Sequence, residues 1–210
     1  MIAIIDYDAG NIKSVEHALE HLGAEAIITR DADTILNADG VILPGVGSFG
    51  DAMDKLNRYN LIDVIHEVVN REIPFLGICL GLQLLFEESE ESEGVKGLGL
   101  LKGRIVRIPD EPGKKIPHIG WNDLTFPKGT AGTLFDQLPE HPYVYFVHSY
   151  YLNAAEDIVT ATTEYGTTRI EAAVQKGRIY ACQFHPEKSS EVGMSILRQF
   201  LGCVSKCGEQ

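Results

Sequence analysis

Cys79 lies in the pentapeptide Gly77-Ile78-Cys79-Leu80-Gly81, which ends an apolar run typical of a buried strand. Glycines two residues on either side of a nucleophile allow a tight strand-to-helix turn, because larger side chains would collide there. The start of the following helix favours a thiolate, and the backbone N–H of Leu80 is free to donate to an oxyanion. The spacing predicts a thiol nucleophile. The pentapeptide alone also fits a buried cysteine among glycines, so both interpretations stay open.

The tripeptide His185-Pro186-Glu187 supplies a base and a group to orient it. Pro186 favours an extended conformation at His185, and residues two apart in extended backbone face the same side. The Glu187 carboxylate can therefore hold the imidazole of His185. A cysteine, a histidine and a carboxylate near strand ends match the general arrangement of nucleophile, base and orienting group. The tripeptide alone also fits a histidine in a turn at the end of a strand.

A third motif, Pro44-Gly45-Val46-Gly47-Ser48-Phe49-Gly50, follows another short apolar run. Its glycines allow close approach of the backbone to a ligand and unusual dihedral angles, so we expect a second oxyanion donor near Val46. One peptide rotation there would decide whether that N–H faces the oxyanion. The segment is not a phosphate loop, because the lysine that follows the glycines of such a loop is missing.

These motifs belong to a first half in which strand and helix patterns alternate. Short apolar runs predict strands over 2–6, 24–29, 41–43 and 75–78, and helical spacing predicts helices over 12–22, 49–56 and 61–70 and after Leu80. Parallel strands need crossover connections, which are nearly always right-handed. The pattern predicts a three-layer, doubly wound α/β fold with helices on both faces of the sheet.

The second half consists of shorter segments interrupted by glycine and proline, which favours antiparallel strands added to a mixed sheet. We expect these strands over 104–108, 121–126, 144–152, 158–163, 172–175 and 178–184, and a closing helix over 189–201. The chain has no internal repeat and no linker rich in serine or proline. We therefore expect one domain over residues 1–210, with a loose tail at 203–210.

Composition narrows the class of protein. The 210 residues are 44% hydrophobic and 23% charged, as in ordinary globular domains, which excludes disordered, collagen-like and coiled-coil chains. A formal net charge of −12 repels nucleic-acid phosphates and anionic lipids. The apolar runs are shorter than the roughly 18 residues of a membrane span. We expect a cytoplasmic protein with neither nucleic acid nor a membrane as partner.

The motifs together resemble those of the class I glutamine amidotransferases and, within them, the glutaminase subunits of imidazole glycerol phosphate synthase, an enzyme of histidine biosynthesis. The likeness runs nearly end to end. Its matching segments are 6–7, 10–11, 44–50, 77–83, 117–122, 145–150 and 184–189. Asp8 departs from the pattern, in which we expect glycine at this position. The resemblance implies a flavodoxin-like fold and no cofactor.

The resemblance implies that glutamine is hydrolysed to glutamate and ammonia. Cys79 attacks the side-chain amide carbon, and the N–H of Leu80 stabilises the oxyanion. His185, oriented by Glu187, protonates the departing ammonia and then activates a water. By the same resemblance, the residues that contact the glutamine are Gly47, Gln83, Glu91, Ser149 and Tyr150. On composition alone, Glu91 belongs to an acidic run that fits a solvated face.

Ammonia must pass to an acceptor, and the resemblance implies a heterodimer with a (β/α)8-barrel cyclase subunit that makes imidazole glycerol phosphate and aminoimidazole carboxamide ribotide. We expect the contact around Trp121, Asn122 and Tyr145, although Trp121 fits a core position equally well. Two alternatives stay open. One is a glutaminase subunit of another ammonia-using synthase, of the anthranilate or pyridoxal phosphate type, and the other is a non-catalytic regulatory subunit.

The remaining candidate ligands do not form a metal site in the sequence. His17 and His21 have the spacing of a metal pair on one helix face, but no third ligand lies nearby, so we expect a solvated surface. Cys203 and Cys207 form a lone pair in a polar tail. Cys182 shares strand parity with Tyr180 and Phe184, which predicts core packing. We expect neither metal nor cofactor.

Overall fold

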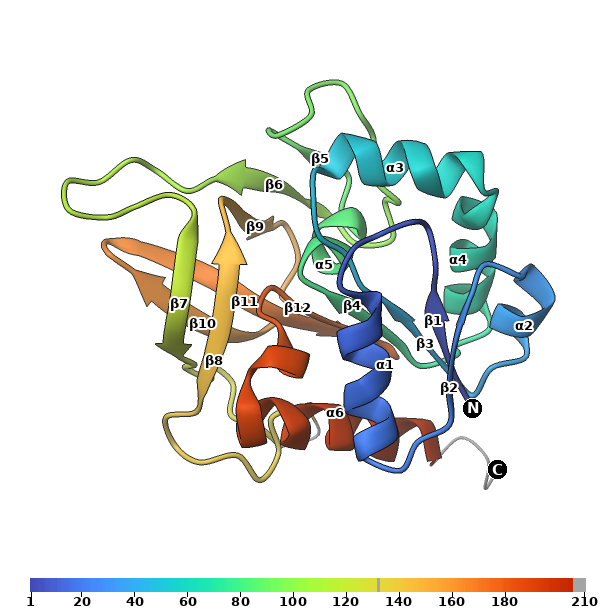
Figure 1. Cartoon of the computed structure of the whole chain (residues 1–210). Helices are drawn as coiled ribbons and strands as arrows, with labels where there is room; N and C mark the ends of the chain where they lie inside the picture. Colours follow the sequence, from blue (N-terminus) through green and yellow to red (C-terminus); the bar gives the residue numbers. More distant parts are fainter. Residues whose placement is uncertain (132, 206–210) are drawn as a thin grey trace.

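A ten-stranded sheet runs through the middle of the computed structural model, which describes residues 1–131 and 133–205 (Figure 1). Its strand order is β2-β1-β3-β4-β12-β11-β9-β6-β5, with β10 beside β11. The strands of this sheet are β1 (Ile2–Ile5), β2 (Ala26–Thr29), β3 (Gly40–Leu43), β4 (Phe75–Ile78), β5 (Glu88–Ser89), β6 (Gly103–Arg107), β9 (Tyr150–Ala154), β10 (Val159–Tyr165), β11 (Thr168–Lys176) and β12 (Ile179–Cys182).

Helices cover both faces of the parallel half, from β2 to β12. The helices are α1 (Ile12–His21), α2 (Ala32–Leu36), α3 (Phe49–Arg58), α4 (Leu61–Asn70), α5 (Leu80–Leu84) and α6 (Ser190–Ser205). One face packs against α1 and α6, and the other against α2, α3, α4 and α5. Ile4 and Ile5, which are neighbours in β1, belong to opposite clusters, as strand alternation requires. The three-layer, doubly wound fold is confirmed.

The strand expected over 144–152 is wrong, because the chain breaks at Ser149. Residues before the break form β8 (Tyr143–His148), which pairs with β7 (His118–Asp123) in a separate two-stranded ribbon, and β9 after the break joins the main sheet. In Figure 1 the β7–β8 ribbon lies at the left of the view, with the start of α6 beside β8. Tyr and other hydrophobic residues run from Tyr143 to Val147 and resume in β9 at Tyr150, so the sequence pattern gave no sign of the break.

Three smaller differences are two short unexpected elements and the end of the last helix. Neither α2 nor β5 was expected, because five residues and two residues are too short to show a period. The closing helix runs on to Ser205 with Val204 buried, so 203–205 are its last residues and not a loose tail. Cys207 lies outside the described residues. No described helix is long and apolar enough to cross a membrane.

Neighbouring parallel strands bring three of the motifs to one edge of the sheet. Leu43 pairs with Gly77, and Ile78 pairs with Cys182, so β3, β4 and β12 end side by side. The glycine-rich segment, Cys79 and His185 follow these three strand ends. Ligands of open α/β sheets bind beyond the carboxyl ends of such strands.

Candidate active site

Cys79 occupies a strained turn between β4 and α5. Its φ of 55° lies in the left-handed region, and its backbone N–H donates to the carbonyl oxygen of Cys182 at 2.8 Å. A side chain at Gly81 would collide with the carbonyl oxygen of Leu43. The predicted turn is therefore present, and the sheet itself holds the nucleophile in place.

His185 and Glu187 form a buried pair beside this turn. Nδ1 of His185 lies 2.8 Å from Oε1 of Glu187, and both side chains are almost fully buried. Glu187 reaches the imidazole through the 3-10 turn η1 (Pro186–Lys188), whereas we expected continued extended backbone. His185 itself is extended, and its carbonyl oxygen accepts a hydrogen bond from Ser189 Oγ at 2.6 Å.

The charge state of His185 follows from its neighbours. Burial lowers its pKa, but hydrogen bonds and charge interactions with Cys79 and Glu187 outweigh burial and raise the pKa to about 10. His185 is therefore an imidazolium through neutral pH. An imidazolium beside a cysteine is the charge partner that a nucleophilic thiolate needs, and it carries the proton that a departing ammonia must receive.

The predicted oxyanion hole is not assembled in this conformation. The N–H of Leu80, expected to be free, donates instead to the carbonyl oxygen of Gly45 at 3.3 Å. The amide N–H and C=O of a trans peptide point in opposite directions, so the Val46 N–H points away from Leu80. The reason is that the glycine-rich segment folds back on the turn, where Tyr7 holds it through a 2.8 Å hydrogen bond to the Pro44 carbonyl.

A cleft of about 270 Å³ opens above Cys79 and His185. Its walls contain every residue that the resemblance assigns to the substrate: Gly47, Gln83, Glu91, Ser149 and Tyr150. Val46 and Leu80 line it as well, whereas Glu187 lies behind His185. The structure thus brings the candidate residues together, and the cleft has the size of a small polar molecule.

Two of the candidate substrate residues, Gln83 and Glu91, are positioned by hydrogen bonds within the protein. Oε2 of Glu91 accepts a hydrogen bond from the N–H of Phe49 at 2.8 Å, so this carboxylate caps the first turn of α3. Gln83 donates to the Tyr150 carbonyl at 3.1 Å and to Gln183 Oε1 at 3.0 Å. Gln183, which the sequence did not single out, also lies 3.8 Å from Cys79 Sγ.

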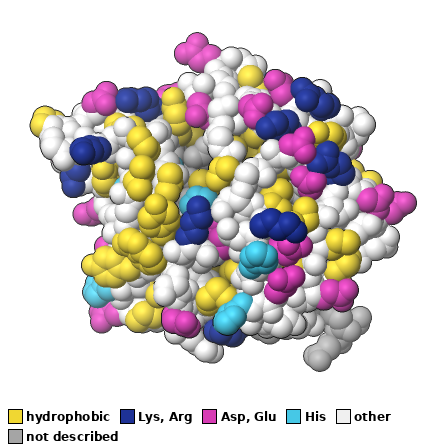
Figure 2. All heavy atoms as spheres, in the orientation of Figure 1, with side chains coloured by type: hydrophobic (Ala, Val, Ile, Leu, Met, Phe, Trp, Pro, Cys, Tyr) yellow, Lys and Arg dark blue, Asp and Glu magenta, His cyan; other side chains and the backbone are white. Residues whose placement is uncertain are grey.

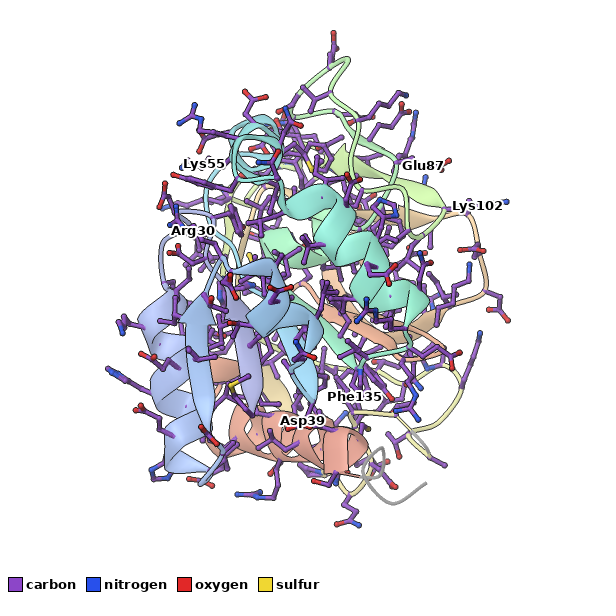
Figure 3. The ribbon with its side chains drawn as sticks, turned by 90° about the vertical axis from the view of Figure 1, so that its right-hand side faces the viewer. Arg30, Asp39, Lys55, Glu87, Lys102 and Phe135 are labelled. Atoms are coloured by element: carbon purple, nitrogen blue, oxygen red, sulfur yellow. The ribbon has the colours of Figure 1, made fainter. Side chains whose placement is uncertain are left out.

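Asn11 is a further residue of the site that sequence reasoning did not identify by role. Its Nδ2 donates to Oε1 of Glu187 at 2.6 Å, the same oxygen that contacts His185. Asp8, the departure from the family pattern, sits at φ 61° in the loop before Asn11 and hydrogen-bonds Arg30 at 2.7 Å and Tyr59. Figure 3 shows Arg30 on the same side of the molecule as Lys55, whose Nζ contacts the Asp8 carbonyl. An aspartate therefore fits where glycine was expected.

Asn11→Gly is expected to lower kcat for glutamine hydrolysis about tenfold with little change in KM, because Glu187 loses a donor that positions it. Glycine keeps the left-handed conformation of position 11, whose φ is 68°. Asn60→Gly is the matched control, since Asn60 also precedes a helix with φ 55° and makes no side-chain cap. Steady-state rates of the complex with the expected cyclase subunit provide the measurement. Equal kcat values for the two variants would contradict this role of Asn11.

The β7–β8 ribbon separates the three expected interface residues. Trp121 and Tyr145 lie opposite one another, with ring centroids 5.9 Å apart, and Trp121 is 50% exposed, so its core interpretation is wrong. Ile119 and Tyr143 are exposed like Trp121, and with the half-buried Tyr145 these residues form an apolar patch, visible over the ribbon in Figure 2. Asn122 faces the other way, toward His118.

The other candidate ligands lie apart. His17 and His21 are exposed on α1, and Cys182 is fully buried in the core, both as predicted. Within residues 1–131 and 133–205, no group of three or more His, Cys, Asp or Glu side chains could hold a metal ion. Cys203 is a partly exposed thiol on α6.

The comparison with known families agrees with this geometry. The family model "Glutamine amidotransferase class-I" matches residues 3–203. The chain belongs to the class I glutamine amidotransferases. Among solved structures of similar fold, the structure of PurLQS from Thermotoga maritima aligns with a TM-score of 0.74 at 23% identity, covering 97% of this chain and 98% of that chain. A crystal structure of a glutamine amidotransferase aligns with a TM-score of 0.75 at 19% identity, covering 98% and 100%.

Curated relatives of this amidotransferase are more similar in sequence. The imidazole glycerol phosphate synthase subunit HisH of Bacillus cereus (strain G9842) is 50% identical over 204 residues, covering 97% of this chain and 95% of that protein. The subunit of the same name from Thermosynechococcus vestitus is 49% identical over 205 residues, covering 97% of each chain. That from Lactococcus lactis is 48% identical over 200 residues. The resemblance found in the motifs is confirmed.

Proposed function

We propose that this amidotransferase is the glutaminase subunit of an imidazole glycerol phosphate synthase. The observation that carries the proposal is the position of His185, paired with Glu187, beside Cys79 at the floor of a cleft lined by the candidate substrate residues. The names of the relatives favour this synthase over the anthranilate and pyridoxal phosphate types. A non-catalytic subunit would not need to keep a buried, fully paired imidazolium beside a thiol.

The reaction follows from the positions of these groups. The Cys79 thiolate adds to the side-chain amide carbon of glutamine, and His185 gives its proton to the departing ammonia, leaving a glutamyl thioester. The neutral His185 then takes a proton from water, which attacks the thioester and releases glutamate. Glu187 keeps the imidazole turned toward the thiol in both steps.

Ammonia needs an acceptor on another chain, and the names of the relatives describe a subunit of a synthase. A (β/α)8-barrel cyclase that makes imidazole glycerol phosphate and aminoimidazole carboxamide ribotide is the partner that fits this chemistry. The apolar patch of Ile119, Trp121, Tyr143 and the half-buried Tyr145 supports a docking face on the β7–β8 ribbon, because aromatic side chains are enriched in interfaces.

Glutamate release by the chain alone, by the complex, and by the complex with the cyclase's own ligand tests the proposal. The hydrogen bond from Leu80 to Gly45 takes the two predicted donors away from the oxyanion, so the chain alone should be nearly idle. Rotation of the Gly45–Val46 peptide would restore the Leu80 and Val46 donors, each worth about a hundredfold to a thousandfold in kcat. We expect a rise confined mainly to kcat. Absence of glutamate in all three samples would contradict the function, and equal rates would contradict the rotation.

Trp121→Ala is expected to weaken binding to the cyclase about thirtyfold, because a half-exposed tryptophan at the centre of an apolar patch is a typical hot spot. Ile27→Ala is the control, since Ile27 is 39% exposed on β2, at the opposite edge of the main sheet. Dissociation constants of the purified pair provide the measurement. Asn122→Ala should act more weakly, because Asn122 faces inward. Unchanged affinity in Trp121→Ala would place the interface elsewhere.

A further inference from the structure

Four polar contacts join the cleft to the far side of the β7–β8 ribbon. His148 Nδ1 lies 2.9 Å from the carbonyl oxygen of Tyr150, and His148 Nε2 lies 3.0 Å from His118 Nδ1. His118 Nε2 lies 2.9 Å from Asn122 Oδ1, and Asn122 Nδ2 donates to the carbonyl oxygen of Glu164 at 3.0 Å. We call this line, from the Tyr150 carbonyl to the Glu164 carbonyl, the histidine chain.

The histidine chain has fewer protons than contacts when its members are neutral. It begins and ends on a carbonyl oxygen, which can only accept, so its four contacts need four protons. Each neutral imidazole brings one proton, whichever nitrogen carries it. The amide of Asn122 has one donating end, so it brings one proton to the line in either orientation. Three protons leave one contact in which two lone pairs or two oxygens face each other.

We propose that His118 and His148 bind one additional proton, shared between the two ring nitrogens that lie 3.0 Å apart, and that this proton fixes the Ser149–Tyr150 bend to the ribbon. The role of the bend in holding glutamine rests on the proposed function. The Tyr150 carbonyl also accepts from Gln83, so donors from two sides fix it. Both histidines act through this bend and are positioning residues.

The groups around His118 and His148 include some that favour the additional proton and some that oppose it. His118 stacks between Phe146, at 5.1 Å, and Tyr165, at 4.0 Å, and aromatic faces stabilise a cation. The charged and titratable groups that face the pair among the described residues are His185 across the cleft, Lys114 beside His118 and the phenol of Tyr165. His185 directly precedes η1, Lys114 lies in the loop before β7, and Tyr165 is the last residue of β10.

Burial lowers the pKa of each imidazole taken singly, and the neighbouring cations lower it further. The shared proton opposes this effect, because it replaces a repulsion between lone pairs with a charge-assisted hydrogen bond. The two rings therefore titrate as one unit, and that unit binds its proton more tightly than burial alone would allow.

Two substitutions of Asn122 should have opposite effects on this proton. Asn122→Ala removes the outer acceptor, so His118 can donate through Nδ1 to His148, and two neutral rings then satisfy the two remaining contacts. Asn122→Asp keeps an acceptor at that end and adds the opposite charge, so the pair should hold its extra proton more tightly. Asn122 is partly exposed, and both variants should fold.

The decisive measurement counts protonated ring nitrogens by NMR of the full chain labelled with [15N]histidine, near neutral pH. Of the four ring nitrogens of His118 and His148, three should carry a proton in the wild type and in Asn122→Asp, but two in Asn122→Ala. Two in the wild type, or three in Asn122→Ala, would overturn the shared proton. This count requires neither glutamine nor a partner, so it is informative even if the proposed function fails.

A kinetic measurement tests the positioning role in the complex saturated with cyclase. As the wild-type pair loses its proton at alkaline pH, KM for glutamine should rise about fivefold, the effect of one lost hydrogen bond, while kcat follows His185. In Asn122→Ala, KM should not change with pH. The same rise in KM in both proteins, or none in the wild type, would refute the positioning role.

Discussion

Cys79→Ala is expected to abolish glutamate formation, with a loss of at least about a thousandfold in kcat, because no other described thiol reaches the cleft. The substitution removes one sulfur from a side chain that is 7% exposed, so the fold should persist. Glutamate release by the complex provides the measurement.

Cys203→Ser is the matched control for this experiment, since Cys203 lies on α6, away from the cleft lining. Its activity should equal that of the wild type. Retained binding of the cyclase would show that the Cys79 variant is folded. Activity near the wild-type level in Cys79→Ala would refute the assignment of the nucleophile.

His185→Ala is expected to be nearly as severe, because residues that act as a unit lose most of their function together. Glu187→Gln should be milder, about tenfold to a hundredfold, since Glu187 orients the base and does not react. A greater loss in Glu187→Gln than in His185→Ala would mean that the role of the carboxylate is misassigned.

The pH dependence of Glu187→Gln provides an independent readout. In the wild type the raised pKa keeps His185 protonated from its ordinary value of 6.5 up to about 10, so the alkaline fall in kcat/KM should come near the upper value. Removing the negative charge of Glu187 lowers the pKa of His185, and the fall should move toward neutral pH. The stability that this pair contributes is complete below pH 6.5 and declines as pH rises through the folded pKa. An unchanged alkaline limb would contradict the ion pair.

The catalytic residues could be predicted because their positions depend on local rules. Glycines around Cys79 force a turn, short apolar runs predict parallel strands, and parallel strands end at a common edge. The contact between Asn11 and Glu187 spans 176 positions. Asn11 has a left-handed conformation and Glu187 lies in a 3-10 turn, so no local pattern contains the contact. The same holds for the peptide orientation at Gly45, where glycine permits two orientations and only tertiary contacts select one.

The second half of the fold was less predictable, for a different reason. Burial alternates through β8 and resumes in β9 almost without interruption, yet the two strands belong to different sheets. Alternation records which side chains are covered, not what covers them. The exposure of Trp121 illustrates this limit, since an aromatic residue in a strand fits both a core and an interface.

The attachment of Cys79 and His185 to adjacent central strands has a consequence for thermal inactivation. The backbone N–H of Cys79 donates a hydrogen bond to the carbonyl oxygen of Cys182, the last residue of β12. His185 follows that strand by three residues. The triad should therefore last as long as the sheet, and only global unfolding should separate its members. Turnover lost on mild warming, while the sheet remains intact, would reflect the glycine-rich segment or the departure of the partner. Such a loss should reverse on cooling.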